Sequence, residues 1–194
     1  MRSVIASEFV SLDGVMESPE NWQFPFFNEE MGEAIGAAMS AADALLLGRL
    51  TYEEWAAYWP SQSPDDNRIA GYMNNTQKYV VSATLEEPLE WTNSTLIKGN
   101  VADEINGLKQ QPGKDISISG SGILIQSLMQ EDLIDELRIM VHPVVVGSGK
   151  RLFAEAGDQK SLELIESKTF AMGVVYLTYR PAGKQENIDR KETR

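Results

Sequence analysis

The sequence predicts an α/β fold, a three-layer α/β/α domain built around a mixed, mostly parallel central sheet. Strand-like and helix-like segments alternate from the N-terminus to about residue 130, as in sheets whose parallel strands are joined by helices. Beyond residue 136 the pattern becomes strand-rich, which predicts an antiparallel portion at the end of the same sheet. The 194 residues are enough for one domain with a sizeable core.

The first half of the chain contains five predicted elements. Alternating side chains predict a strand at residues 3–10. A helix is predicted at 29–42, because apolar side chains recur there at helical spacing. The apolar run 44–47 predicts a buried strand, and segments 52–58 and 68–75 predict helices. The apolar face of the first helix comprises Met31, Ile35, Ala38, Met39 and Ala42.

The second half begins with two short strands and ends in a strand-rich segment. Asn100, followed three residues later by Asp103, indicates the N-cap of a helix. Pro112-Gly113 predicts a turn after that helix. The predicted order is strands 78–82 and 94–97, helix 101–109, strand 116–119, helix 123–130, and strands 136–146, 162–168 and 174–180.

A single domain is predicted for residues 1–180. The stretch 181–194, PAGKQENIDRKETR, has one large apolar residue, Ile188, and cannot bury enough surface to offset the cost of ordering. It is therefore predicted to be a polar, flexible tail.

The composition excludes several classes of function. The net charge of −12 disfavours nucleic acid and anionic membranes as partners, and no stretch is long and apolar enough to span a bilayer. The chain has no cysteine and only one histidine, so we expect no protein-bound transition metal. These features favour a cytoplasmic protein that acts on a small-molecule substrate.

Glycine-rich turns follow two of the predicted buried strands. Gly120-Ser121-Gly122 joins a strand directly to a helix, and Gly48 occupies the same position after another strand. Such turns present free N–H groups and the positive end of a helix dipole to an anion. The alternative is a pair of tight strand–helix turns without a ligand. In an open α/β sheet both turns can lie at the carboxyl ends of strands, where ligands bind.

Two side chains beside Gly48 extend this argument. Arg49 offers a fixed guanidinium for a phosphate, or pairs instead with Glu53 or Glu54. Thr51 is a candidate cap for the following helix.

A third candidate loop follows the first strand. Asp13 precedes Gly14, a combination typical of turns, and it is also a candidate polar anchor or proton carrier in a mobile loop over the site. The glycines of segment 147–150 and His142 are interpreted as structural.

The chain resembles the dihydrofolate-reductase-like superfamily. In particular it is similar to stand-alone relatives of the C-terminal reductase domain of RibD, the bifunctional riboflavin deaminase-reductase. Over residues 1–180 the matching segments are SLDGVME, LLLGRLTYEEW, KYVVSATL, ISGSGILIQSLMQEDLIDEL and HPVVVGSGKRLF. The resemblance implies a dihydrofolate-reductase-like fold and NADPH lying across the strand ends. The cofactor-binding residues that it implies are Ala6, Ser7, Gly48, Arg49, Thr51, Ser82, Gly120, Ser121, Gly122 and Ile123.

The chain departs from its relatives at three places. Ala83 stands where relatives often carry an arginine, which leaves Arg49 as the candidate for the 2′-phosphate and NADH as an alternative cofactor. Ser119 stands where riboflavin reductases carry a substrate-binding glutamate. The segment GRLTYEE replaces an Ala-Asp-Asp-Pro-like run.

The resemblance implies a reductase that transfers a hydride from the nicotinamide to a C=N or C=O of a small heterocyclic or sugar-linked substrate. The precedent is 5-amino-6-(5-phosphoribosylamino)uracil reductase of riboflavin biosynthesis. Asp13 or an ordered water is the candidate proton source. The alternatives are a minor dihydrofolate reductase and a catalytically idle, dimeric dinucleotide-binding module. A homodimer could form through the apolar segment 141–146.

Overall fold

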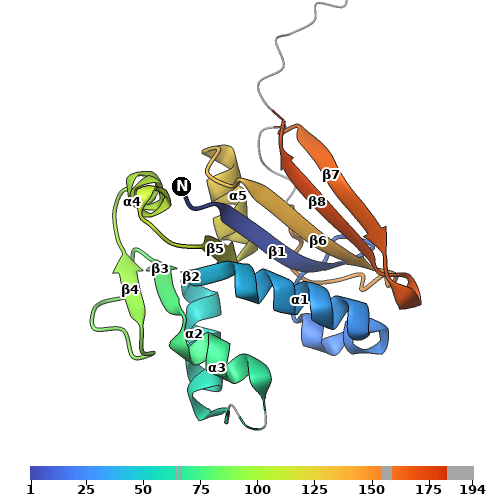
Figure 1. The fold of residues 1–194 in the computed structure, drawn as a ribbon, viewed down its shortest axis with the longest axis horizontal. Helices are drawn as coiled ribbons and strands as arrows, with labels where there is room; N and C mark the ends of the chain where they lie inside the picture. The colour runs from blue at the N-terminus through green and yellow to red at the C-terminus, as the bar shows by residue number, and fades with distance from the viewer. Residues whose placement is uncertain (64, 66, 154–158, 183–194) are drawn as a thin grey trace, which may run out of the picture.

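One eight-stranded sheet organises the computed structural model, which describes residues 1–63, 65, 67–153 and 159–182 (Figure 1). Its strands lie in the order β4-β3-β2-β5-β1-β6-β8-β7. Their bounds are β1 Val4–Ser11, β2 Ala42–Gly48, β3 Gln77–Val81, β4 Ser94–Ile97, β5 Asp115–Ile118, β6 Glu136–His142, β7 Leu162–Thr169 and β8 Val175–Pro181.

The sheet is parallel from β4 to β6 and antiparallel beyond it. β1 pairs in parallel with both β5 and β6, and β2 pairs in parallel with β3 and β5. β8 runs antiparallel to β6 and to β7. The predicted mixed, mostly parallel sheet is thus confirmed.

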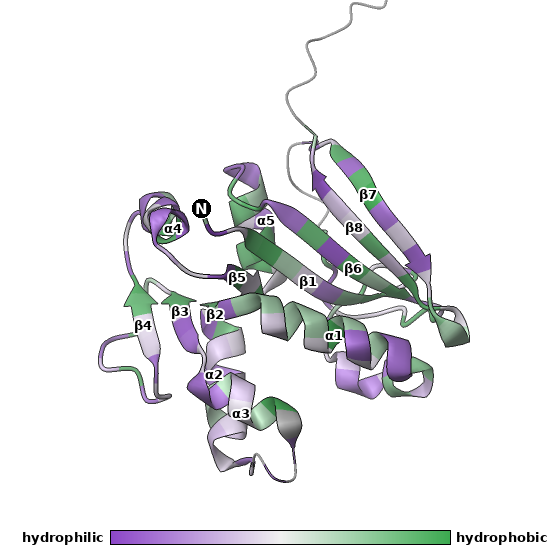
Figure 2. Ribbon diagram, in the orientation of Figure 1, coloured by the Kyte–Doolittle hydropathy of each residue, from purple (hydrophilic) through white to green (hydrophobic). Residues whose placement is uncertain are grey.

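Helices cover both faces of the sheet and produce the predicted three layers. α1 crosses one face and α5 lies behind the sheet in Figure 1, where Figure 2 shows α5 as largely hydrophobic. α4 and α5 pack with β1, β2 and β5 in the main core, while α2 and α3 pack on the other face of β2 and β3. The helices are α1 Glu29–Ala41, α2 Arg49–Tyr58, α3 Arg68–Asn75, α4 Val101–Gln110 and α5 Gly122–Gln130.

Short 3₁₀ segments complete the described elements. Two precede α1, one follows α2 and one joins β7 to β8. Their bounds are η1 Pro19–Asn21, η2 Phe24–Phe26, η3 Trp59–Ser61 and η4 Ala171–Gly173.

Several predicted boundaries shift for local physical reasons. α1 ends at Ala41, because Ala42 already begins β2. α2 begins at Arg49, three residues before the predicted start, so Thr51 is not its cap but lies in its first turn. β6 ends at His142 rather than at residue 146, because Pro143 has no N–H to continue the ladder.

The polar end of the chain joins the sheet slightly further than predicted. β8 includes Pro181, and the Ala182 N–H donates to the carbonyl of Ser161 at 3.0 Å. Residues 183–194 of the predicted tail lie outside the described residues. The homodimer predicted through segment 141–146 stays a prediction.

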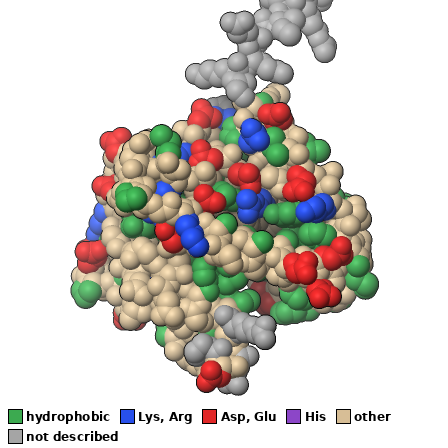
Figure 3. Space-filling view, viewed as in Figure 1, with side chains coloured by type: hydrophobic (Ala, Val, Ile, Leu, Met, Phe, Trp, Pro, Cys, Tyr) green, Lys and Arg blue, Asp and Glu red, His purple; other side chains and the backbone are tan. Residues whose placement is uncertain are grey.

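The described surface carries charges of both signs. In Figure 3 acidic side chains are spread over the visible face, with Lys and Arg between them. No helix in the described part of the chain is both long and apolar enough to cross a membrane.

Candidate functional site

Two glycine turns touch each other where β2 and β5 end. The strands lie side by side and parallel, so both turns leave the sheet at the same edge. A Cβ built on Gly48 would stand 2.2 Å from Ser121 Oγ, and one built on Gly120 would stand 3.2 Å from Thr51 Cγ2. Only glycine lets the two segments of main chain approach this closely.

The two helices that begin at these turns, α2 and α5, lack the side-chain N-cap that the other three α-helices of the described chain have. α1, α3 and α4 each follow an asparagine whose side chain accepts a backbone N–H of the helix. α2 follows Gly48 and α5 follows Ser121, and neither has a side-chain cap. The first N–H groups of a helix lack intrahelical partners and carry partial positive charge. Two uncapped helix ends in contact therefore suit an extended anion such as a diphosphate.

The turn after β5 has an unusual backbone conformation. Gly120 and Ser121 both have left-handed φ values, 83° and 67°. A Cβ built on Gly122 would stand 2.8 Å from Met16 Sδ, so the loop after β1 packs on this turn. Ile123, in the first turn of α5, is 77% exposed and presents an apolar side chain at the edge of the site.

Arg49 lies at the first residue of α2 but is already paired. Its Nη1 contacts both carboxylate oxygens of Glu53, at 2.9 and 3.1 Å. Each side chain of this pair is 42% exposed. An exposed i,i+4 pair of this kind contributes only about 0.3–0.5 kcal/mol, so a phosphate could displace Glu53 at small cost.

Ser82 follows β3 at the same edge of the sheet, because Val81 pairs with Gly48. Its Oγ accepts the N–H groups of Thr84 and Leu85, at 3.1 and 3.0 Å. The hydroxyl thus closes the turn after β3 and is available to a ribose phosphate only as a donor.

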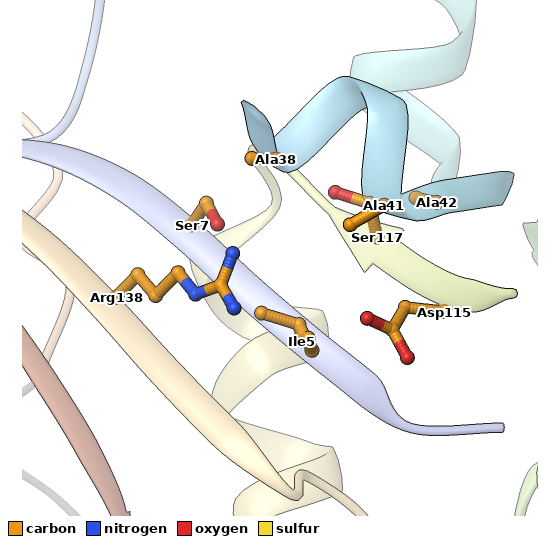
Figure 4. A pocket seen from close by; sticks show the side chains of 8 residues that line it. All are labelled: Ile5, Ser7, Ala38, Ala41, Ala42, Asp115, Ser117 and Arg138. Carbon is orange, nitrogen blue, oxygen red and sulfur yellow. The ribbon is translucent and has the colours of Figure 1, made fainter. Parts of the chain in front are cut away.

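Ala6 and Ser7 belong to β1, next to the turn after β5. Ala6 pairs with Ile118, so Ser7 lies beside the beginning of that turn. The Ser7 hydroxyl is buried without a hydrogen-bond partner. It lines a small, open depression beneath the end of α1, into which Arg138 also points (Figure 4). The lining residues are Ile5, Ser7, Ala38, Ala41, Ala42, Asp115, Ser117 and Arg138.

Asp13 fastens two loops together. Its carboxylate accepts hydrogen bonds from Ser11 Oγ at 2.6 Å and from the N–H groups of Val146 and Gly147 at 3.0 and 2.9 Å. Arg151 Nη2 lies 3.8 Å away. The Ser11 hydroxyl, followed by the two N–H groups, lowers the pKa of Asp13 to about 2. The group is therefore ionised at neutral pH, which favours the role of polar anchor over that of proton carrier.

Replacing Asp13 by asparagine tests the two roles. If the site carries the NADPH-dependent reduction that the resemblance implies, Asp13→Asn should lower turnover and leave the Kd for NADPH largely unchanged, because the carboxylate contacts the loops at residues 11–13 and 146–147 and not the glycine turns. Ser11→Ala is the matched control, since it removes the 2.6 Å hydrogen bond and keeps the carboxylate. Equal losses of turnover in both variants would assign the effect to loop anchoring. Loss of cofactor binding in Asp13→Asn would contradict the prediction.

Glu8 is a residue of this site that the sequence prediction missed. It lies on β1 between Ala6 and Val10, is 7% exposed, and its Oε1 accepts the Gly120 N–H at 2.7 Å. Burial raises the pKa of Glu8 to about 8, against a smaller lowering by the Gly120 hydrogen bond. The period-2 alternation of the strand could have revealed it, because that alternation places Glu8 on the inward face.

Metal-binding groups are not part of the described site. Among residues 1–63, 65, 67–153 and 159–182, no group of three or more His, Cys, Asp or Glu side chains could hold a metal ion. The one histidine, His142, packs edge-on against Phe9 and Trp22, and burial lowers its pKa.

The chain matches a known protein family over most of its length. The model of the RibD C-terminal domain matches residues 2–176. The chain belongs to this family. The uncharacterized protein YyaP of Bacillus subtilis (strain 168) is 32% identical to this chain over 180 residues, which cover 92% of this chain and 94% of YyaP.

Solved structures agree with membership of the RibD C-terminal domain family. A protein of Shewanella sp. PV-4, whose name links it to riboflavin biosynthesis, is 25% identical with a TM-score of 0.76, and the match covers 94% of this chain and 100% of that one. Dihydrofolate reductase from Enterococcus faecalis, solved in complex with NADP(H), is 15% identical with a TM-score of 0.63, over 93% and 97% of the two chains. The RibD C-terminal domain described here therefore has a dihydrofolate-reductase-like fold.

Proposed function

We propose that the protein is an NAD(P)H-dependent reductase that transfers a hydride to a C=N or C=O of a small heterocyclic or sugar-linked substrate. The observation that carries this proposal is the contact between the turns at Gly48 and Gly120, with two uncapped helix ends beside them. The family supports a reductase related to that of riboflavin biosynthesis.

The residues present fit a dinucleotide. The first N–H groups of α2 and α5 would bind the diphosphate, and Arg49 would turn from Glu53 to a phosphate of the adenosine half. Ile123 would cover an apolar ring at the start of α5. A bound nicotinamide cofactor supplies the hydride, so the protein needs chiefly to orient cofactor and substrate.

A polar part of the substrate would contact the α1 side of β1 at Ser7, which lies next to the turn after β5. Ser7 and Arg138 are paired neighbours on β1 and β6 and share the pocket beneath α1. The Ser7 hydroxyl has no partner among the described residues and would donate a hydrogen bond to a polar substrate atom. This bond would offset the free-energy cost of burying the hydroxyl. These two side chains favour a substrate with oxygen or nitrogen acceptors.

The proposal is tested by titrating the protein with NADPH and NADH while following nicotinamide fluorescence. Arg49→Ala should weaken NADPH binding roughly 10- to 100-fold, because it removes charge-assisted hydrogen bonds to a phosphate. Binding of NADH should weaken less if Arg49 contacts the 2′-phosphate.

Glu53→Gln is the matched control for this titration. It breaks the ion pair of Arg49 but keeps the guanidinium, so NADPH should bind as well as to the unchanged protein or more tightly. Absence of binding of either nucleotide to the unchanged protein would refute the reductase proposal. If Arg49→Ala raises the Kd for NADPH and the Kd for NADH by the same factor, Arg49 does not contact the 2′-phosphate.

A second candidate function is dinucleotide binding without turnover. The low pKa of Asp13 favours this candidate, because the proposed proton carrier is ionised. The candidates are separated by measuring cofactor consumption on one preparation with two substrates. These are 5-amino-6-(5-phosphoribosylamino)uracil and dihydrofolate. Binding without consumption on both substrates would favour the idle module.

A further inference from the structure

We propose that Glu8 is a positioning residue which makes dinucleotide binding depend on the proton carried by its buried carboxyl group. The inference rests on the proposed function, since it concerns the same glycine turns. It adds a regulatory property: the diphosphate binds when Glu8 is neutral and is repelled when Glu8 is ionised.

The geometry places the carboxyl group directly beneath the turn. Glu8 faces the main core between Ala6 and Val10, on the side of the sheet that α5 covers. Its Oε1 accepts the Gly120 N–H at 2.7 Å, and Gly120 immediately precedes the uncapped start of α5. The carboxyl group therefore holds the first residue of the glycine turn in place.

In the part of the chain that the structure describes, α5, β5 and β6 offer Glu8 no charge partner; β5 contributes Ile116 and Ile118 to this core. α5 has no ionisable side chain between Gly122 and Gln130. β6 presents Leu137, Ile139 and Val141 on the same face. Among the described residues, burial raises the pKa of Glu8 to about 8, and the Gly120 hydrogen bond lowers it by less.

Two charged pairs occupy the segments on either side of the turns. Arg49 pairs with Glu53 in the first turns of α2, and Asp13 lies beside Arg151 in the loops that cover Gly122. In each pair the two charges offset one another. Deprotonation of Glu8 would therefore place an uncompensated negative charge in the core.

Ionisation of Glu8 acts against a bound diphosphate in two ways. The carboxylate repels the phosphate charges through a medium that water screens poorly. The carboxylate also offsets the partial positive charge at the start of α5 and so weakens the attraction of this helix end for a diphosphate. A neutral carboxyl group keeps the hydrogen bond to Gly120 without these costs, so the complex favours protonated Glu8.

Linkage gives the sign of the pH dependence. If the complex holds the proton more firmly than the free protein does, binding takes up a proton above the pKa of free Glu8, about 8. Affinity should then be constant at lower pH and fall toward tenfold per pH unit above that value. Below pH 7 the free protein is already protonated at Glu8, and the dependence disappears.

The experiment measures Kd for NADH from pH 6.5 to 9.5, because NADH lacks the 2′-phosphate whose own titration would intrude. The unchanged protein should lose roughly tenfold affinity per unit at the alkaline end. Glu8→Gln should show a flat profile, and Glu163→Gln, which alters an exposed carboxylate on β7, should keep the original profile. Calorimetry of the unchanged protein in two buffers at pH 9 should show uptake of nearly one proton.

The outcomes separate this inference from the proposed function. Binding with a flat profile in the unchanged protein, or with the same profile in Glu8→Gln, would overturn the role of Glu8 and leave the reductase proposal standing. Absence of NADH and NADPH binding at every pH would refute both. If Glu8→Gln does not fold, absence of proton uptake by the unchanged protein at pH 9 would still overturn the role of Glu8.

Discussion

Replacing Gly48 by alanine should weaken dinucleotide binding roughly 10- to 100-fold, an effect typical of overpacking a close contact. The added methyl group would stand 2.2 Å from Ser121 Oγ and 2.8 Å from Ser121 Cβ. Rotation about χ1 can move the Ser121 Oγ away, but the Cβ is fixed to the backbone, so the methyl group fits only if the turn shifts. The starts of α2 and α5 would separate, and the diphosphate would lose one of its two groups of N–H donors.

The matched control removes the obstacle rather than the glycine. Ser121→Gly suits the left-handed conformation at that position and empties the space that the methyl group added by Gly48→Ala would need. The double variant Gly48→Ala/Ser121→Gly should therefore regain much of the lost affinity. Fluorescence titration with NADPH measures all three variants. Unchanged affinity in Gly48→Ala, or no recovery in the double variant, would show that this contact does not shape the site.

Replacing Glu8 by glutamine should change the free energy of unfolding in a pH-dependent way. Relative to the unchanged protein, the variant should be more stable at pH 8 than it is at pH 5. The pKa of Glu8 is raised in the folded protein from 4.5 to about 8, so the folded state holds a proton that the unfolded state releases. The stability of the unchanged protein therefore falls as the pH rises from 4.5 to 8. The difference corresponds to roughly 4 kcal/mol across that window, as an upper estimate.

Urea unfolding at pH 5, 6.5 and 8 measures this effect. The free energy of unfolding of Glu8→Gln, minus that of the unchanged protein, should increase from pH 5 to 6.5 and again from 6.5 to 8, because glutamine does not ionise. At pH 5 the unchanged protein, with Glu8 protonated, should be as stable as the variant or more stable. Parallel pH profiles for the two proteins would contradict a buried, proton-holding carboxyl group. Glu163→Gln, on the exposed strand β7, should follow the unchanged protein throughout.

Local patterns predicted the order of helices and strands well. Asn100 caps α4, as its spacing from Asp103 predicts, and the helix at residues 68–75 has the predicted bounds. The errors lie where neighbouring elements compete for the same residues. Thr51 looks like a cap in the sequence, yet α2 begins earlier, because Gly48 ends β2 and the helix can follow immediately.

The candidate site was predicted less completely than the fold. The two glycine turns were found because glycine at the end of a buried strand is a local signal. Asp13 was proposed as a site residue from its turn. The nearby Ser11 hydroxyl is the first cause of its low pKa, but the two N–H groups that lower the pKa further belong to Val146 and Gly147, more than a hundred residues away. Glu8 was missed. The alternation of its strand places it on the inward face, but its contact with Gly120 joins residues that lie more than a hundred positions apart in the sequence.

The amino-acid sequence by itself determined the α/β class, the mixed sheet and the identity of the two turns, since these follow from periodicity and from the backbone freedom of glycine. Only the tertiary structure decided that Gly48 packs against Ser121 and that Glu8 lies beneath Gly120. Each contact joins a residue of one strand to the turn after another strand, β5, and the charge of Glu8 depends on the water that the sheet and α5 exclude. Such effects arise from burial and distance, which no short stretch of sequence contains.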